Sequence, residues 1–234
     1  MAKNKTRSAL IIIDMENAFL EKEASHCIQN AAATVPALIR TIQAARSFGI
    51  PVFFVKRIYR ADGSDVEMTR YQSWKNGGKA MTPGSEGVCS AQAPKGLKPQ
   101  KGDYTIIKPR WSAFFHTELD LILRRLGIRT VILTGTTTPN CIRTTAYDAN
   151  SLEYNVVVIE DCCSSQTEEI QRVNIEDMRR MGAVILSSQE FISDYLHCPP
   201  ADLSEKIRKE VYSSKDAPEL FEESGSECLR IDKW

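Results

Sequence analysis

The chain has 234 residues, of which 42% are hydrophobic and 26% charged, so it can bury a substantial core and is expected to form one main domain. Its 30 basic residues balance its 30 acidic ones, which argues against nucleic acid as a partner. No stretch approaches the roughly 20 apolar residues that cross a bilayer, and the apolar run before Asp14 is too short for a signal peptide. We therefore expect a cytoplasmic protein that does not enter a membrane.

Short apolar runs rich in β-branched residues recur along the chain, with helical patterns between them. These runs are Ala9 to Ile13, Val52 to Val55, Tyr104 to Ile107, Val131 to Leu133, Val156 to Ile159 and Val184 to Leu186. Such alternation is typical of βαβ units, in which helices cover both faces of a parallel sheet. We predict an α/β fold with three αβα layers and a Rossmann-like, six-stranded parallel sheet that has helices on both faces.

Two of the predicted helices are preceded by residues that typically mark the start of a helix. Thr117 with Asp120 predicts a capping arrangement before LDLILRRL, and Thr167 similarly precedes EEIQRVNIEDMRRM. Three apolar residues of the second helix are expected to share one buried face: Ile170, Val173 and Met178.

Between the second and third predicted strands lies a long stretch, roughly residues 57–102, that is rich in Gly, Ser, Pro and charge. Long loops inside compact domains are usually functional or disordered. Two interpretations stay open, a solvated surface excursion and a lid or subunit contact. After Phe191 the chain becomes polar, and one further helix is predicted at Asp202 to Tyr212. We expect a main domain over residues 1–196 and a C-terminal appendage over residues 197–234.

The seven cysteines are odd in number and have no spacing that suggests a disulfide framework. In a chain of this size they fit reduced thiols better than disulfides. A thiol redox protein that uses Cys162 and Cys163, or Cys141, is an alternative. Adjacent cysteines are poorly placed for a disulfide, however, and no C-x-x-C motif is present.

Three predicted strand ends carry residues of complementary chemistry. Asp14 ends the first strand, the third runs into Lys108, and Cys141 follows the fourth at the start of a helix. Ligands of parallel α/β sheets bind beyond these strand ends. A helix N-terminus and an ammonium group would lower the pKa of the thiol, and a carboxylate could accept its proton. Each residue alone could be structural, but together they indicate acyl transfer.

The motifs around these residues resemble those of a known family. Asp14 within IIIDMENAF, Lys108 within IIKPRWSAFFHTELD and Cys141 within VILTGTTTPNCIRTTAYDA are similar to motifs of the isochorismatase-like cysteine hydrolases, which include nicotinamidases, N-carbamoylsarcosine amidohydrolases and ureidoacrylate amidohydrolases. The resemblance covers roughly residues 8–191. It implies that Asp14, Lys108 and Cys141 form a catalytic triad.

The resemblance also implies an oxyanion hole and an assembly state. Family members have a non-proline cis peptide a few residues before the cysteine, which would fall at Thr136-Thr137 here. The backbone N–H of Thr137, with that of Cys141, would then stabilise the developing oxyanion. Because the family commonly forms dimers or tetramers, a homo-oligomer is expected.

Two departures from the family pattern lie in the first motif. The family usually has Gln where this chain has Glu16, and an aspartate where it has Ala18. In addition, the metal-binding histidines that nicotinamidases carry after the second strand have no counterpart, since His26, His116 and His197 are scattered along the chain. We therefore expect no metal and no cofactor, which disfavours a metal-dependent nicotinamidase.

Cationic and aromatic residues near the predicted strand ends are candidates for substrate binding. The candidates are Phe19, Arg57, Tyr59, Arg110 and Trp111. Arginine can bind a substrate carboxylate through two parallel hydrogen bonds. Alternatively, Arg57 and Arg110 pair with acids of the long loop, such as Asp62, Asp65 or Glu67.

These observations predict a cysteine hydrolase that cleaves an amide-type C–N bond of a small molecule, carbamoyl, ureido or amide, through a covalent thioester acyl-enzyme. Ester or carbamate cleavage is a near alternative, because the same nucleophile serves any acyl transfer. The alternative of another class is a non-catalytic protein of the same fold that binds a small molecule or acts as a scaffold.

Overall fold

The structure is a computed structural model that describes residues 7–94, 96–199 and 202–213. The chain divides into two compact units, Met1–Pro200 and Ala201–Trp234, and each is described by itself.

The first unit is built on a parallel sheet whose strands coincide with the six apolar runs. The described strands are β1 (Ser8–Ile13), β2 (Val52–Arg57), β3 (Tyr104–Lys108), β4 (Thr130–Thr136), β5 (Asn155–Ser164) and β6 (Val184–Leu186). Their spatial order is β3-β2-β1-β4-β5-β6, and all neighbours are parallel. This confirms the predicted α/β fold. The strand order reverses between β1 and β4, the kind of position where such sheets bind ligands.

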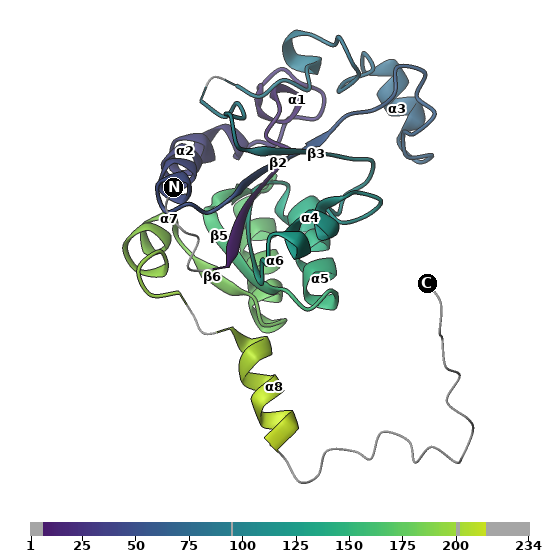
Figure 1. Ribbon diagram of the computed structural model, residues 1–234. Helices are drawn as coiled ribbons and strands as arrows, with labels where there is room; N and C mark the ends of the chain where they lie inside the picture. The colour runs from purple at the N-terminus through teal and green to yellow at the C-terminus, as the bar shows by residue number, and fades with distance from the viewer. Residues whose placement is uncertain (1–6, 95, 200–201, 214–234) are drawn as a thin grey trace, which may run out of the picture. The chain divides into compact units, whose positions relative to one another are not determined.

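Helices cover both faces of this sheet (Figure 1). The α-helices of the first unit are α1 (Asn17–Leu20), α2 (Ala31–Ser47), α3 (Tyr71–Asn76), α4 (Leu119–Arg125), α5 (Arg143–Ser151), α6 (Glu168–Arg180) and α7 (Ser188–Glu190). A 3₁₀ turn, η1 (Gly87–Cys89), and two π-helical turns, η2 (Thr138–Ile142) and η3 (Phe191–Tyr195), complete the list. Helices α2 and α7 lie on one face of the sheet, and α4, α5 and α6 lie on the other (Figure 1).

The two faces of the sheet carry separate apolar cores. Along β1, Leu10 and Ile12 pack into the core under α2, while Ile11 and Ile13 pack into the core under α4 and α5. Alternation between faces follows from the two-residue period of a strand. Because both faces are covered, every residue of β1 is buried, and each buried side chain of this kind contributes about 1.5–3 kcal/mol. The sheet is thus a rigid platform for the residues at its ends.

One of the two predicted helix caps is confirmed. The Thr167 hydroxyl accepts a hydrogen bond of 3.2 Å from the backbone N–H three residues later, at the start of α6. The arrangement predicted at Thr117 and Asp120 is confirmed only in part. The Thr117 hydroxyl accepts a hydrogen bond of 3.3 Å from the N–H of Leu119, the first residue of α4, but the N-cap residue is Glu118. Asp120 instead pairs with Arg124 one turn later, at 2.9 Å.

The predicted buried face of α6 is wrong in two of its three positions. Met178 is buried, but Ile170 and Val173 are 39% and 48% exposed, and Ile175 is buried in their place. Residues two positions apart on a helix point about 200° apart, so Val173 faces away from the sheet when Ile175 faces it.

The segment between β2 and β3 is a folded substructure and not a solvated excursion. Trp74 of α3 is only 2% exposed and donates a hydrogen bond of 2.9 Å from its indole N–H to the Ala80 carbonyl. Met81 and Leu97 join it in the core on the α2 side of the sheet. The segment lies with α1 beside β2 and β3, at the top of the view in Figure 1.

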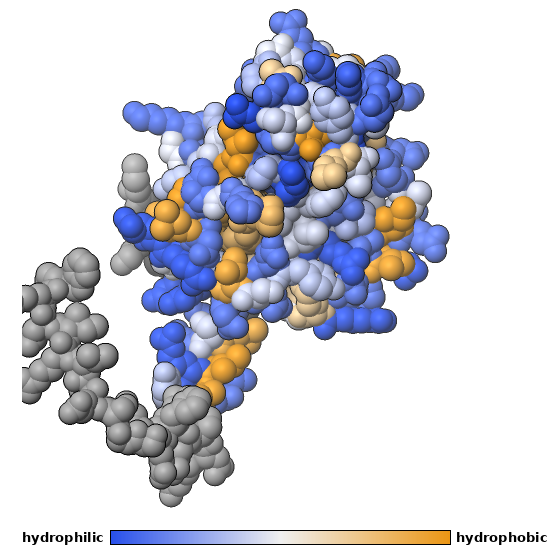
Figure 2. All heavy atoms as spheres, turned by 90° about the vertical axis from the view of Figure 1, so that its right-hand side faces the viewer, coloured by the Kyte–Doolittle hydropathy of each residue, from blue (hydrophilic) through white to orange (hydrophobic). Residues whose placement is uncertain are grey.

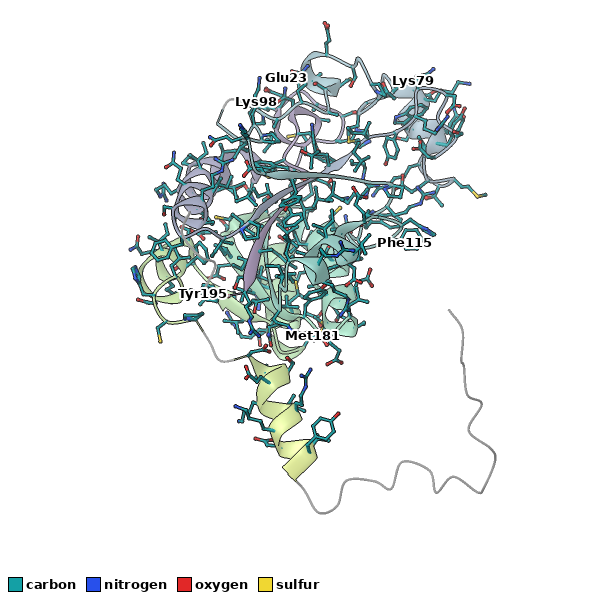
Figure 3. The ribbon with its side chains drawn as sticks, in the orientation of Figure 1. Glu23, Lys79, Lys98, Phe115, Met181 and Tyr195 are labelled. Atoms are coloured by element: carbon teal, nitrogen blue, oxygen red, sulfur yellow. The ribbon has the colours of Figure 1, made fainter. Side chains whose placement is uncertain are left out.

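The C-terminal part of this unit is anchored to the sheet. Tyr195, labelled in Figure 3, stacks on Phe191 with ring centroids 5.5 Å apart, and its hydroxyl shares a hydrogen bond of 2.7 Å with that of Ser8 at the start of β1.

The second unit has one described helix, α8 (Leu203–Ser213), which confirms the helix predicted at 202–212. The remainder of the predicted appendage, residues 214–234, lies outside the described residues, and the boundary at 196/197 stays a prediction. No helix within the described ranges is long and apolar enough to cross a membrane.

Candidate active site

Asp14 is fixed at the carboxyl end of β1, next to the reversal of strand order. Its backbone N–H donates to the Val55 carbonyl at 2.9 Å, and its φ of 50° turns the chain out of the strand. On the neighbouring strand, Gly135 has a φ of 110°, and a Cβ built there would lie 2.1 Å from the Ile13 carbonyl oxygen. Glycine is therefore required where β4 approaches β1.

Lys108 and Asp14 form a buried ion pair across the end of the sheet. The Lys108 Nζ lies 2.8 Å from Asp14 Oδ2, and neither side chain is more than 1% exposed. The ammonium also donates to the Arg110 carbonyl at 2.9 Å and lies 3.5 Å from the Cys141 Sγ. The other carboxylate oxygen of Asp14 has no hydrogen-bond partner among the described residues. The three residues predicted from the strand ends thus lie together.

Cys141 is held in the turn η2 that leads from β4 into α5. The peptide bond Thr136-Thr137 at the end of β4 is cis, as the resemblance implied. The Thr137 carbonyl then accepts hydrogen bonds from the N–H groups of Asn140 and Ile142, at 3.0 and 3.2 Å. Thr137 and Cys141 line the same cavity. Their role as an oxyanion hole stays a prediction.

The expected low pKa of Cys141 is wrong for the free protein. Burial, with the Asp14 carboxylate as the second cause, raises the pKa of the thiol to about 11. Lys108 and Arg57 act in the opposite direction but do not compensate for these two effects. In the free protein, the surroundings of Cys141 therefore favour the thiol over the thiolate.

Arg57 joins this cluster from the end of β2. Its Nη2 lies 3.9 Å from the Cys141 Sγ, while Nη1 pairs with Glu67 and donates to the Tyr59 hydroxyl at 3.0 Å. Tyr59 in turn donates to Glu67 at 2.7 Å. The alternative that Arg57 pairs with an acid of the long loop is therefore confirmed, and the pairing fixes the guanidinium beside the thiol.

A cavity of about 350 Å³ opens above Cys141. Its lining residues are Phe19, Ser25, His26, Cys27, Ile28, Arg57, Arg70, Ser73, Trp111, Thr137, Pro139, Asn140, Cys141, Gln166 and Ile170. Of the predicted substrate-binding residues, Phe19, Arg57 and Trp111 belong to this lining.

Tyr59 and Arg110, also predicted to bind substrate, do not line the cavity. Tyr59 supports Arg57, and Arg110 donates to the backbone carbonyls of Asp65 and Pro109 at 2.7 and 2.6 Å. Neither residue is therefore placed to contact a molecule in the cavity directly. Phe115 does not line it either; its side chain is half exposed beside α4 (Figure 3).

Sequence reasoning missed several residues of the cavity wall. His26 and Arg70 lie in turns, Gln166 lies in a bend, and Ser73 lies in α3. No sequence motif marks any of them. The one usable signal was the length of the segment between β2 and β3, which contributes Arg70 and Ser73. Their approach to Cys141 depends on the folding of that segment.

The cysteines of β5 do not form a redox pair. Cys162 packs into the core on the α2 side of the sheet and Cys163 into the core on the α5 side. Burial raises the pKa of both thiols, and all six described cysteines are free. Within the described ranges, no group of three or more His, Cys, Asp or Glu side chains is arranged to hold a metal ion.

The fold and the site define a doubly wound α/β protein with an acid, an amine and a thiol at its topological switch point. The isochorismatase domain model matches residues 8–190, so the chain belongs to the isochorismatase family.

Individual relatives agree with this placement. The chain is 38% identical to a probable inactive nicotinamidase from Arabidopsis thaliana, over 78% of this chain and 93% of that protein. It is 30% identical to the ureidoacrylate amidohydrolase of Variovorax paradoxus, over 83% and 84% of the two chains.

Solved structures resemble it as well. An isochorismatase family protein from Desulfovibrio vulgaris superposes with a TM-score of 0.76 at 41% identity, covering 80% of this chain and 97% of that chain. The N-carbamoylsarcosine amidase of Thermoplasma acidophilum superposes with a TM-score of 0.65 at 30% identity, covering 78% and 97%.

Proposed function

We propose that this protein is an amidohydrolase that cleaves an amide-type C–N bond of a small molecule through a thioester on Cys141. The observation that carries the proposal is the Asp14–Lys108–Cys141 cluster at the base of a cavity large enough for a small substrate. Relatives named for the hydrolysis of ureido and carbamoyl compounds support the reaction class.

In the proposed reaction, the free oxygen of Asp14 accepts the Cys141 proton as the thiolate attacks the substrate carbonyl. The N–H groups of Thr137 and Cys141 stabilise the oxyanion. When the C–N bond breaks, Asp14 returns the proton to the leaving nitrogen and a thioester remains. Water then gives its proton to Asp14 and attacks the thioester, and the collapse of that intermediate releases the acid and restores the thiol.

Lys108 and Arg57 have electrostatic roles in this scheme. Asp14 becomes neutral when it takes the proton, and the negative charge moves to sulfur. The Lys108 ammonium, at 2.8 Å from the carboxylate and 3.5 Å from the sulfur, can stabilise the charge at both positions. Arg57 adds a second cation at 3.9 Å from the sulfur.

The second candidate function is non-catalytic binding of a small molecule. It is favoured by the Arabidopsis relative, whose name describes it as a probable inactive nicotinamidase. Ala18, at the position where the family usually has an aspartate, and the raised pKa of Cys141 are compatible with it. The intact cluster of three reactive residues supports catalysis instead.

A hydrolysis screen tests the proposal. Full-length protein is incubated with ureido acids, N-carbamoyl amino acids and small amides, and the released ammonia or amine is measured. We expect turnover of at least one class and a loss of about 10³-fold or more in kcat for Cys141→Ser, Asp14→Asn and Lys108→Met. Cys89→Ser is the matched control, because this half-buried cysteine lies outside the cavity. Undiminished turnover in Cys141→Ser would refute the scheme.

A further inference from the structure

The cavity above Cys141 has an unbalanced charge. Its described lining contains two arginines, Arg57 and Arg70, and no aspartate or glutamate. Of the acids beside the site, Asp14 pairs with Lys108 and Glu67 pairs with Arg57, while Glu16 accepts a hydrogen bond from the Arg57 backbone N–H. A substrate that enters this cavity therefore meets a positive potential that the lining does not neutralise.

Arg70 is the cation of this lining that lacks a carboxylate partner among the described residues. Its guanidinium lies over the Trp111 ring, 5.5 Å from the ring centroid. Arg70 is half-buried, on the loop that precedes α3, and Trp111 follows β3. Stacking on an aromatic ring orients a guanidinium and leaves its N–H groups available for a planar anion.

Arg57 is less suited to bind a distant group of the substrate. Its Nη1 is bound by Glu67 and Tyr59, and its Nη2 lies beside the Cys141 sulfur. It therefore acts at the reacting centre. We call the part of the lining beside Cys141 and Arg57 the reaction end, and the part formed by Arg70 and Trp111 the recognition end.

The neighbouring His26 is affected by both arginines, although its burial has the larger effect. Burial, followed by the charges of Arg70 and Arg57, lowers the pKa of His26. Its ring is thus kept neutral near pH 7, and its Nδ1 lies 3.0 Å from the Ser25 hydroxyl. The recognition end therefore offers hydrogen bonds from neutral groups around a single guanidinium.

We propose that Arg70, stacked on Trp111, is the receptor for a carboxylate at the end of the substrate remote from the scissile C–N bond, so that the substrates are ω-amido or ω-ureido carboxylic acids. The part concerning the scissile bond rests on the proposed function. Charge-assisted hydrogen bonds from a guanidinium to a carboxylate are strong enough to give the acid an affinity about 10-fold to 100-fold higher than that of its uncharged amide.

Binding can be measured without turnover in full-length protein that carries Cys141→Ala. Isothermal titration calorimetry compares straight-chain ω-amido and ω-ureido acids of two to five carbons with the neutral terminal amide of each. We expect at least one acid to bind about 10-fold or more tightly than its amide. Adding Arg70→Gln should remove this preference, whereas Arg70→Lys should retain part of it.

Arg125→Gln is the matched control, because Arg125 is an exposed arginine at the end of α4 that does not belong to the cavity lining. The proposal is overturned if no acid in the series binds better than its amide, or if the preference persists in Arg70→Gln. Wild-type turnover of the same compounds separates the two proposals. Acids that bind through Arg70 but are not hydrolysed refute the amidohydrolase alone, and hydrolysis without any preference for acids refutes the role of Arg70 alone.

Discussion

In the free protein, burial of the sulfur, followed by the charge of the Asp14 carboxylate, raises the pKa of Cys141 and favours the thiol. A fully formed thiolate would add a second negative charge next to the first. Transfer of the proton from sulfur to Asp14 avoids this, since one negative charge merely moves within the cluster. Substrate binding therefore has a defined role, which is to place a carbonyl where the sulfur can attack as its proton leaves.

This balance gives a prediction for the pH dependence of alkylation. With the pKa of Cys141 raised to about 11, the rate of modification by iodoacetamide should rise about tenfold per pH unit from pH 7 to 10 without a plateau. A free cysteine in a short peptide, with a pKa of about 8.5, should level off within this range. Peptide mass spectrometry locates the label, and Cys141→Ala confirms the site. A plateau at Cys141 below pH 8 would show a preformed thiolate.

Glu16 gives a second prediction at the residue scale. Its side chain is completely buried, one carboxylate oxygen accepts from the Arg57 N–H at 3.2 Å, and the other has no partner among the described residues. Burial, followed by repulsion from Asp14, raises its pKa well above the usual value. A carboxyl group with a raised pKa thus occupies the position where the family usually has glutamine.

A group with a raised pKa in the folded state stabilises the fold below its unfolded pKa, and this contribution is lost as the pH rises through the folded pKa. Glu16→Gln keeps the shape and removes the titration. We expect the stability of the variant relative to wild type to increase as the pH is raised above about 4.5, measured by urea unfolding at several pH values. A difference that does not change with pH would show that Glu16 is charged in the folded protein.

At the scale of the elements, the segment between β2 and β3 builds one wall of the cavity. It carries Arg70 and Ser73 to the site, and it is held to the core by Trp74. We expect Trp74→Ala to cost about 3–5 kcal/mol in unfolding free energy, since it removes a buried aromatic side chain, and its indole hydrogen bond is lost too.

Tyr71→Ala is the control for this variant. Tyr71 belongs to the same helix but is 39% exposed, so its loss should cost clearly less. Unfolding in urea, monitored by circular dichroism, measures both variants. Equal costs for the two would mean that Trp74 does not anchor the segment.

The strands could be predicted from the sequence because each contains a short apolar run rich in β-branched residues. The cluster of Asp14, Lys108 and Cys141 could be predicted because its members lie at strand ends or just after one. The caps and the buried faces of the helices were harder to predict from the sequence. Val173 was assigned to a buried face that Ile175 occupies, because the register of α6 depends on its packing against the sheet. Arg70 could not be found, since its place beside Trp111 results from tertiary folding and not from a local pattern.

The raised pKa of Cys141 could not be predicted from the sequence either, because it also depends on tertiary packing. The motif shows that a lysine and a helix start lie near the cysteine, and both lower a thiol pKa. It does not show how completely the sulfur is buried, and burial is the largest effect here.

At the scale of the whole molecule, the described lining of the cavity lies entirely within the first unit. We therefore expect a chain that ends at Pro200 to keep the turnover and the thermal midpoint of the full-length protein. Steady-state assays and differential scanning fluorimetry measure the two quantities. A loss of turnover at an unchanged midpoint would assign the C-terminal segment a direct role in the reaction.

The expected homo-oligomer stays a prediction at this scale. On the face shown in Figure 2, apolar side chains form separate patches among hydrophilic ones. Exposed apolar residues include Phe115 between β3 and α4, and Leu121 and Leu126 in and after α4. Analytical ultracentrifugation of the full-length protein determines whether such patches mediate self-association.

The most direct test of the central claim is to trap the acyl-enzyme. Full-length protein is mixed with a substrate from the hydrolysis screen, quenched in acid within the first turnovers, and examined by intact-protein and peptide mass spectrometry. The account predicts an adduct with the mass of the acyl part of the substrate on the peptide that contains Cys141, and no adduct in Cys141→Ala. An adduct on another residue, or hydrolysis that persists in Cys141→Ala, would contradict it.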